Sequence, residues 1–183
     1  MSLGHAILAV LATDKCTGYE LANHLDRAVS YYWPSSHQQI YLELGRLAER
    51  GWVTFRTKPG KTQREMKIYW TTRSGITELV RWCSEPSEPI KPKEALLIRI
   101  FAGPLVGPDI VVQTLADHHA AHKARLDEYL AIEQKYFPDP NNIPGAEEYR
   151  YITLRRGILH EKAWLEWYRE ALRRIEGMRK AGI

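Results

Sequence analysis

One group of residues in this 183-residue sequence has the types and spacing to bind base edges. It lies between Ser35 and Glu49 and carries amides, hydroxyls and one guanidinium. Its members are Ser35, Ser36, Gln38, Gln39, Tyr41, Leu42 and Arg46. A glutamine amide can pair with adenine, a leucine can touch a thymine methyl, and an arginine can bind guanine or phosphate. The group therefore predicts contacts in a groove of double-stranded DNA.

A second group is basic and follows directly. The segment from Arg50 to Arg73 contains seven basic residues and one acid, although the whole chain has a net charge of only +4. At its centre are Lys58, Lys61, Thr62, Gln63 and Arg64. Such side chains bind phosphates and give affinity and register rather than sequence specificity. Cations on an exposed strand edge also block aggregation, but their position beside the polar group favours DNA.

The elements that must position these groups follow from periodicity. Apolar residues at helical spacing predict three short helices, at 3–12, from Thr17, and from Ser35 or Ser36, the last with Ile40, Leu44 and Leu47 inward. Thr17 with Glu20, and Ser36 with Gln39, have the spacing of capping boxes. Alternation then predicts a β-hairpin of 53–58 and 66–70 with a basic tip, followed by a helix from about 74. This order is that of a winged helix-turn-helix, in which the third helix enters the major groove.

Proline-rich stretches divide the chain. Pro86, Pro89 and Pro92 predict a linker over 85–92 between a DNA-binding domain at 1–84 and a second domain at 93–183. The second domain has three helical segments, at 94–102, 109–136 and 147–180. The expected fold class is therefore mainly α with a small β-hairpin wing.

The last helical segment is apolar over an unusually wide surface. One stripe contains Leu154, Ile158, Leu165, Tyr168, Leu172 and Ile175, and a second contains Ile152, Leu159, Ala163, Trp167, Ala171 and Met178. A helix of this kind must be covered on several sides. The preceding helices can cover one side, and a second copy of the chain is expected to cover the other, so the first stripe is interpreted as a homodimer interface.

Aromatic residues cluster on the same segment, at Trp164, Trp167 and Tyr168. They could form a wall of a site for a small aromatic effector. Large apolar side chains at helical spacing are more often packing, so the dimer core is the favoured interpretation and the effector site the alternative.

Other chemistry finds little support. His118 and His122 have the spacing of two metal ligands on a helix, but no Cys, His or Glu cluster accompanies them. No phosphate-binding loop, dinucleotide fingerprint or catalytic triad is present in the sequence, so neither an enzyme nor a cofactor is expected. No apolar run approaches the length of a membrane span. A cytoplasmic location without a membrane partner is the expectation.

The first 82 residues resemble the PadR-type transcriptional regulators. The resemblance rests on Ala6-Ile7-Leu8-Ala9-Val10-Leu11, Gly18-Tyr19-Glu20-Leu21, Trp33-Pro34, Tyr41-x-x-Leu44-x-x-Leu47-x-x-x-Gly51-Trp52-Val53, Lys67-x-Tyr69-x-Thr71 and Gly75. Two positions depart from the family pattern. The proline usual after the third-helix tyrosine is Leu42, and the leucine before the threonine is Trp70.

The resemblance implies a homodimer on a pseudo-palindromic operator, usually repressing transcription, and often responding to small aromatic molecules. It also adds Tyr19, Tyr41, Lys67 and Tyr69 to the residues expected near DNA. A winged-helix module that binds a protein, or a ligand sensor acting through a partner protein, remains the alternative, because a fold alone does not determine function.

Overall fold

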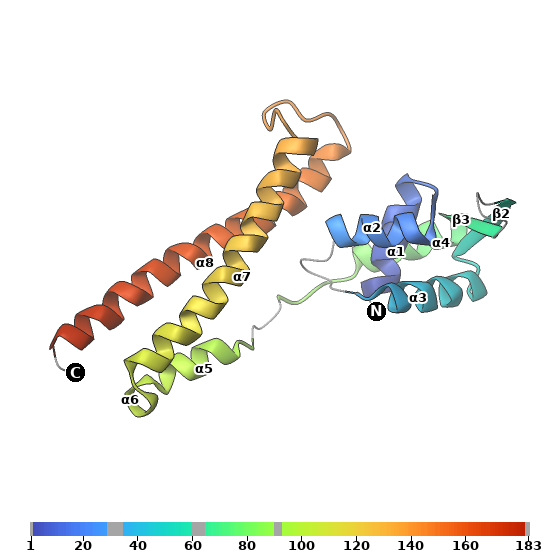
Figure 1. Cartoon of the computed structure of the whole chain (residues 1–183). Coiled ribbons are helices and arrows are strands. Elements are labelled where there is room, and N and C mark those ends of the chain that lie inside the picture. Colours follow the sequence, from blue (N-terminus) through green and yellow to red (C-terminus); the bar gives the residue numbers. More distant parts are fainter. Residues whose placement is uncertain (1, 29–34, 60–64, 90–92, 182–183) are drawn as a thin grey trace. The chain divides into compact units, whose positions relative to one another are not determined.

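The computed structural model describes residues 2–28, 35–59, 65–89 and 93–181. The chain forms two compact units, Met1–Pro89 and Ile90–Ile183, each of which is described by itself. Figure 1 gives the order of the elements along the chain. Lys61, Thr62 and Arg64, expected at the tip of the wing, lie outside the described residues.

The first unit begins with three helices, α1 (Ser2–Thr13), α2 (Gly18–Ala28) and α3 (His37–Glu49). Both capping boxes predicted from the sequence are confirmed. The Ser36 hydroxyl accepts from the Gln39 amide at 3.2 Å, and the Gln39 side-chain oxygen accepts from the Ser36 amide at 2.8 Å. The Glu20 carboxylate accepts from the Thr17 amide at 2.8 Å, and the Thr17 hydroxyl accepts from the Glu20 amide at 3.2 Å. These bonds satisfy amides that the first helical turn leaves without partners, and so fix where α2 and α3 begin.

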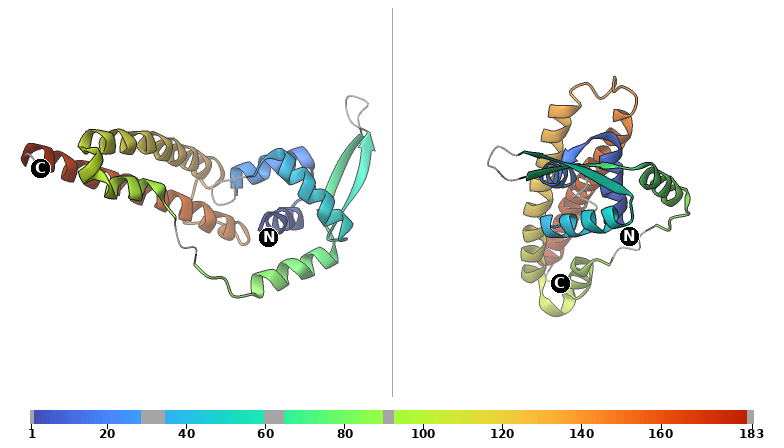
Figure 2. Two further views of the ribbon diagram at one scale, coloured as in Figure 1. Left: turned by 90° about the horizontal axis from the view of Figure 1, so that it is seen from below. Right: turned by 90° about the vertical axis from the view of Figure 1, so that its right-hand side faces the viewer.

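A small antiparallel sheet follows, with a helix after it. Strands β2 (Val53–Pro59) and β3 (Glu65–Thr71) form the predicted hairpin, in a register that pairs Phe55 with Tyr69. A further strand, β1 (Cys16–Thr17), pairs with the other edge of β3, so the strand order is β1-β3-β2. The helix α4 (Arg73–Ser84) begins at Thr72, whose hydroxyl accepts from the Gly75 amide. The hairpin projects beyond the helices of its own unit in both views of Figure 2.

One hydrophobic core holds the first unit together. It takes residues from α1, α2, α3 and the sheet, and all are almost completely buried. Its members are Ile7, Leu8, Leu11, Cys16, Leu21, Ala22, Leu25, Ile40, Leu44, Leu47 and Val53. The three residues of α3 are those predicted to face inward. Burying them fixes the roll of α3 about its axis, so its opposite face is turned to solvent.

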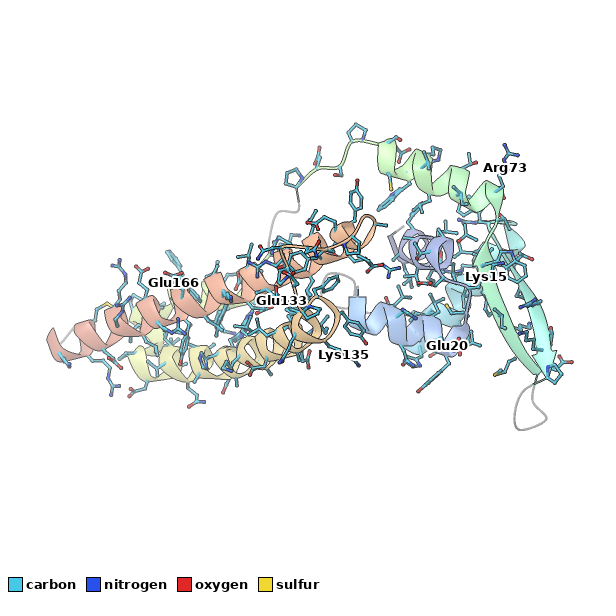
Figure 3. All side chains as sticks on the ribbon, turned by 90° about the horizontal axis from the view of Figure 1, so that it is seen from above. Lys15, Glu20, Arg73, Glu133, Lys135 and Glu166 are labelled. Carbon is cyan, nitrogen blue, oxygen red and sulfur yellow. The ribbon has the colours of Figure 1, made fainter. Side chains whose placement is uncertain are left out.

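In the part that the structure describes, the secondary-structure elements of the second unit are all helices. Two short helices, α5 (Ala95–Phe101) and α6 (Gly103–Val106), precede the long helices α7 (Pro108–Tyr136) and α8 (Glu147–Ala181). Gly107 has a φ of 86° and Pro108 is the first residue of α7, a combination that ends α6 and starts the next helix. Helices α7 and α8 pack along each other. Glu133, labelled in Figure 3, lies near the loop end of α7. Its carboxylate accepts from the Tyr151 hydroxyl at 3.0 Å and from Arg155 at 3.3 Å.

Within the described ranges, none of the helices is both long enough and apolar enough to cross a bilayer.

Candidate nucleic-acid interface

The outer face of α3 carries the side chains that the sequence predicted for base contacts. Five of them are exposed, namely Gln38, Gln39, Tyr41, Leu42 and Arg46, and Ser36 at the N-cap is exposed as well. Leu42 is 58% exposed, which is unusual for a leucine on a helix whose other leucines are buried. The structure therefore brings a polar face with one apolar side chain onto a single short helix.

The two glutamines of this face differ in how far their side-chain amides are available to bind a base. The side-chain oxygen of Gln39 is engaged at the N-cap by the Ser36 amide, and its donor is held near the start of the helix. Gln38 is exposed on the same turn. A bidentate pair with adenine uses both the oxygen and the nitrogen of an amide. Gln38 is therefore the better candidate for reading a base, and Gln39 and Ser36 act mainly by holding the helix end in place.

Arg46 makes an ion pair on its own helix. Its guanidinium lies 3.2 Å from the Glu43 carboxylate and is 67% exposed. An exposed pair of this kind contributes little to stability, about 0–1 kcal/mol. Arg46 can therefore exchange Glu43 for a phosphate at small cost.

Two tyrosines meet where α2, α3 and β3 come together. The ring of Tyr41 lies against Gly18, where a Cβ atom would be only 2.4 Å from the Tyr41 Cε1 atom. Burial raises the pKa of Tyr69, and the neighbouring Tyr41 raises it further. Tyr19, the next residue along α2, is 64% exposed. Gly18 thus leaves room for the Tyr41 ring because it has no side chain, and the next residue, Tyr19, is exposed to solvent.

The base of the wing holds a cation above an aromatic pair. Lys67 Nζ lies 4.3 Å from the centroid of the Phe55 ring, and that ring is 5.4 Å from the ring of Tyr69. Phe55 pairs directly with Tyr69 across the strands. Lys58 is exposed on the neighbouring strand. Sequence analysis missed Phe55, and the cross-strand register between 55 and 69 is the signal that could have found it.

The predicted dimer stripe divides into two parts in the structure. Ile158, Leu165 and Ile175 are 0%, 4% and 7% exposed within the subunit itself. Leu154, Tyr168 and Leu172 are half-buried. The interpretation of the first three as partner-facing is therefore corrected, because the subunit's own helices already cover them. Three residues of the second stripe, Ile152, Leu159 and Met178, are between 46% and 56% exposed.

The aromatic residues of α8 form a stacked cluster with histidines of α7. The His122 ring stacks on Trp164 at 3.8 Å, and the His119 ring lies 4.3 Å from Tyr168. His122 Nδ1 is 2.5 Å from a carboxylate oxygen of Glu161, which is buried. Sequence analysis did not anticipate this pair, since its members are 39 residues apart.

The metal interpretation of His118 and His122 gains nothing from this geometry. In the described portion of the chain, no group of three or more His, Cys, Asp or Glu side chains could hold a metal ion.

The geometry of the first unit, three helices followed by a basic hairpin, defines the class of winged helix-turn-helix regulators. Two family descriptions match the chain: "Transcriptional regulator PadR-like family" over residues 7–81 and "Virulence activator alpha C-term" over residues 92–176. The "Probable transcriptional regulator Rv1176c" of Mycobacterium tuberculosis is 33% identical, with 98% of this chain and 100% of that protein covered. The chain belongs to the PadR-like family of transcriptional regulators, which confirms the resemblance seen in the sequence.

Solved structures agree with this assignment. Bacillus subtilis PadR in complex with operator DNA superposes with a TM-score of 0.83 at 25% identity, over 96% of this chain and 99% of that chain. The same Bacillus protein has also been solved with p-coumaric acid. The virulence activator AphA of Vibrio cholerae superposes with a TM-score of 0.81 at 27% identity, over 96% of this chain and 99% of that chain. The expected fold class is confirmed by these similarities.

Proposed function

We propose that this protein binds a pseudo-palindromic DNA operator as a homodimer and represses transcription from it. The observation that carries the proposal is the exposed face of α3 beside a basic hairpin. Ile40, Leu44 and Leu47 hold the helix on the core, and Gln38, Leu42 and Arg46 point away from it. A short helix with a polar outer face is what the major groove admits. Operator binding by the Bacillus relative supports the same use of this unit.

The proposed contacts fall into two kinds. Gln38 and Leu42 are positioned to distinguish bases, by an amide pair with adenine and by contact with a thymine methyl. Lys58 and Lys67 on the hairpin, and Arg46 at the far end of α3, are positioned for phosphates. Tyr41 is a neighbour of Tyr69, and Tyr19 is exposed at the start of α2; these three hydroxyls can donate to phosphate oxygens. Lys61, Thr62 and Arg64 extend the same basic segment in the sequence.

A second copy of the chain is the proposed cover for the exposed apolar surface of the second unit. Phe101 and Leu105 are each 90% exposed, and Ile98 is 71% exposed. Leu159 on α8 adds a further exposed apolar side chain at 54%. Exposed apolar surface of this extent marks an interaction site. Two copies of α3 would then bind operator half-sites about one helical turn, ~34 Å, apart on the DNA.

Repression is proposed from the Bacillus relative, a "Negative transcriptional regulator" that is 25% identical over 95% of this chain and 97% of that protein. The solved complex of that relative with p-coumaric acid suggests that a small aromatic molecule releases this protein from its operator. The dimeric unit would then set the distance between the two α3 helices, and the effector would bind one arrangement better than the other.

The test begins with purified protein and random-sequence duplexes, from which bound sequences are selected and aligned. A pseudo-palindrome is expected. Anisotropy titrations of the selected duplex then compare three alanine variants with wild type. Gln38→Ala should relax the preference at one base pair and cost about 1–3 kcal/mol. Lys67→Ala should weaken binding to every sequence and lower the salt slope by about one. Lys162→Ala, an exposed cation of α8, serves as the control and should change neither.

Two results would overturn the proposal. One is a protein that remains monomeric at the concentrations of the titration. The other is a selection that returns random sequence together with a salt slope near zero, which would favour a protein-binding winged helix instead. A promoter fusion carrying the selected site reports the direction of regulation.

A further inference from the structure

A pocket in the second unit combines two tryptophans with one carboxylate. Its lining residues are Glu94 and Leu97 of the α5 region and Trp164 and Trp167 of α8, and its volume is about 240 Å³. Drug-sized sites usually measure about 300–1,000 Å³. This pocket is therefore suited to a molecule with one or two rings.

The aromatic walls are held in place by their neighbours. The Trp164 and Trp167 rings meet edge to face, with centroids 5.6 Å apart and planes at 66°. His122 stacks on Trp164 at 3.8 Å, and its Nδ1 is 2.5 Å from the buried carboxylate of Glu161. Trp164 is therefore fixed by a polar pair between α7 and α8, so the wall exists before any ligand binds.

The tryptophan also carries an unused donor. Trp164 is 9% exposed, and its indole Nε1 is buried without a hydrogen-bond partner among the described residues. A buried donor without a partner is unfavourable. Because this nitrogen is buried, the pocket meets the ring of Trp164 and not its N–H group.

The charge of the pocket selects the ligand. Glu94 is the only charged residue among the four that line it. Its carboxylate is exposed and makes no capping bond to the helix it precedes. A carboxylate beside two indole faces attracts cations, through ion pairing and through cation–π contact, and repels anions.

We propose that this pocket binds a one- or two-ring aromatic cation, with the ring against Trp164 and Trp167 and the cationic group at Glu94. Phenolic acids such as p-coumaric acid are anions at neutral pH and are disfavoured here. The binding site stands by itself, and its role as the effector site rests on the proposed function.

The test compares two probes of opposite charge with the same ring and ether oxygen, para-methoxyphenethylammonium and para-methoxyphenylpropionate. Binding to the full chain is followed by the indole N–H signals in nitrogen-15 NMR spectra, with the Trp164 signal identified by its loss in Trp164→Phe. The cation should bind about tenfold tighter than the anion at low salt and should shift the Trp164 signal. The preference should fall to about threefold in Glu94→Gln. Trp167→Leu should weaken both probes, whereas Trp82→Phe, in the first unit, should weaken neither.

Three outcomes would overturn the site: equal or tighter binding of the anion, an unchanged preference in Glu94→Gln, or shifts confined to other tryptophans. Operator anisotropy measured on the same samples separates the two proposals. Operator binding without cation binding rejects the pocket alone. Cation binding without operator binding retains the pocket and rejects the proposed function. Cation binding that leaves operator affinity unchanged rejects the effector role.

Discussion

Gly75, at the start of α4, is a position where one methyl group should cost the first unit much of its stability. A Cβ atom on Gly75 would lie 2.1 Å from the carbonyl oxygen of Trp52 and 2.8 Å from the Thr71 Cγ2 atom. The first neighbour is backbone, so it cannot rotate away. That same carbonyl accepts the Thr72 amide at 2.9 Å. Relief of the clash must therefore separate α4 from the turn before β2.

The expected cost follows from these contacts. Overpacking a rigid site costs about 1–3 kcal/mol, and weakening the bond from Thr72 to Trp52 adds about 1 kcal/mol. The better helix propensity of alanine offsets up to about 1 kcal/mol of this destabilisation. The net destabilisation expected for Gly75→Ala is about 1–3 kcal/mol. In a unit of this size each kcal/mol corresponds to about 4–8 °C of melting temperature.

Gly45 provides the matched control, because it is also a helical glycine of the same unit. A Cβ atom there would meet nothing within 4 Å, and Gly45 is exposed in the middle of α3. Gly45→Ala should therefore stabilise the unit by about 0.5–1 kcal/mol. Thermal unfolding followed by circular dichroism measures both variants. If Gly75→Ala melts within about 1 °C of wild type while Gly45→Ala is stabilised as expected, the close approach of α4 to Trp52 is wrong.

Further predictions concern the two cysteines and one carboxylate. Burial, and to a smaller extent the nearby acids Glu20 and Asp14, raise the pKa of the Cys16 thiol to about 11. Cys83 is exposed. A thiol reagent should therefore modify one cysteine per native chain and two per unfolded chain. Arg81, followed by His5, lowers the pKa of Glu78 to about 2. The stability that this carboxylate contributes is present above its unfolded pKa, about 4.5. It should be lost as the pH falls towards 2, and acid titrations of wild type and Glu78→Gln should differ in that interval; parallel curves would contradict it.

Local features of this fold could be predicted from the sequence because their causes are local. The start of α3 depends on Ser36 and Gln39, which are three positions apart and need no distant partner. The inward face of the same helix follows from the spacing of Ile40, Leu44 and Leu47. Both features can therefore be predicted from one sequence without knowledge of the tertiary structure.

Features that depend on distant partners could not be predicted in this way. Strand β1 has two residues, too few to show alternation, and exists because it pairs with β3 more than fifty positions later in the chain. Helix α8 shows two apolar stripes, and periodicity does not say which one the subunit covers itself. Ile158 is completely buried and Ile152 is 56% exposed, although each belongs to an equally regular pattern. The position at which α7 packs on α8 determines which stripe is buried within the subunit.

The arrangement of α8 has a consequence for how ligand and operator would influence each other. This helix packs along α7 and buries Ile158 and Leu165, and Trp164 and Trp167 line the pocket from the same stretch of helix. A packed helix shifts as a unit rather than bending at one side chain, so an aromatic cation in the pocket would act on any subunit interface that α8 helps to form. Thermodynamic linkage then requires reciprocity. If the cation weakens operator binding tenfold, saturating operator must weaken cation binding tenfold. Titrating each ligand in the presence of the other measures both factors, and unequal factors would mean that the cation acts at a second site or on an assembly of different stoichiometry.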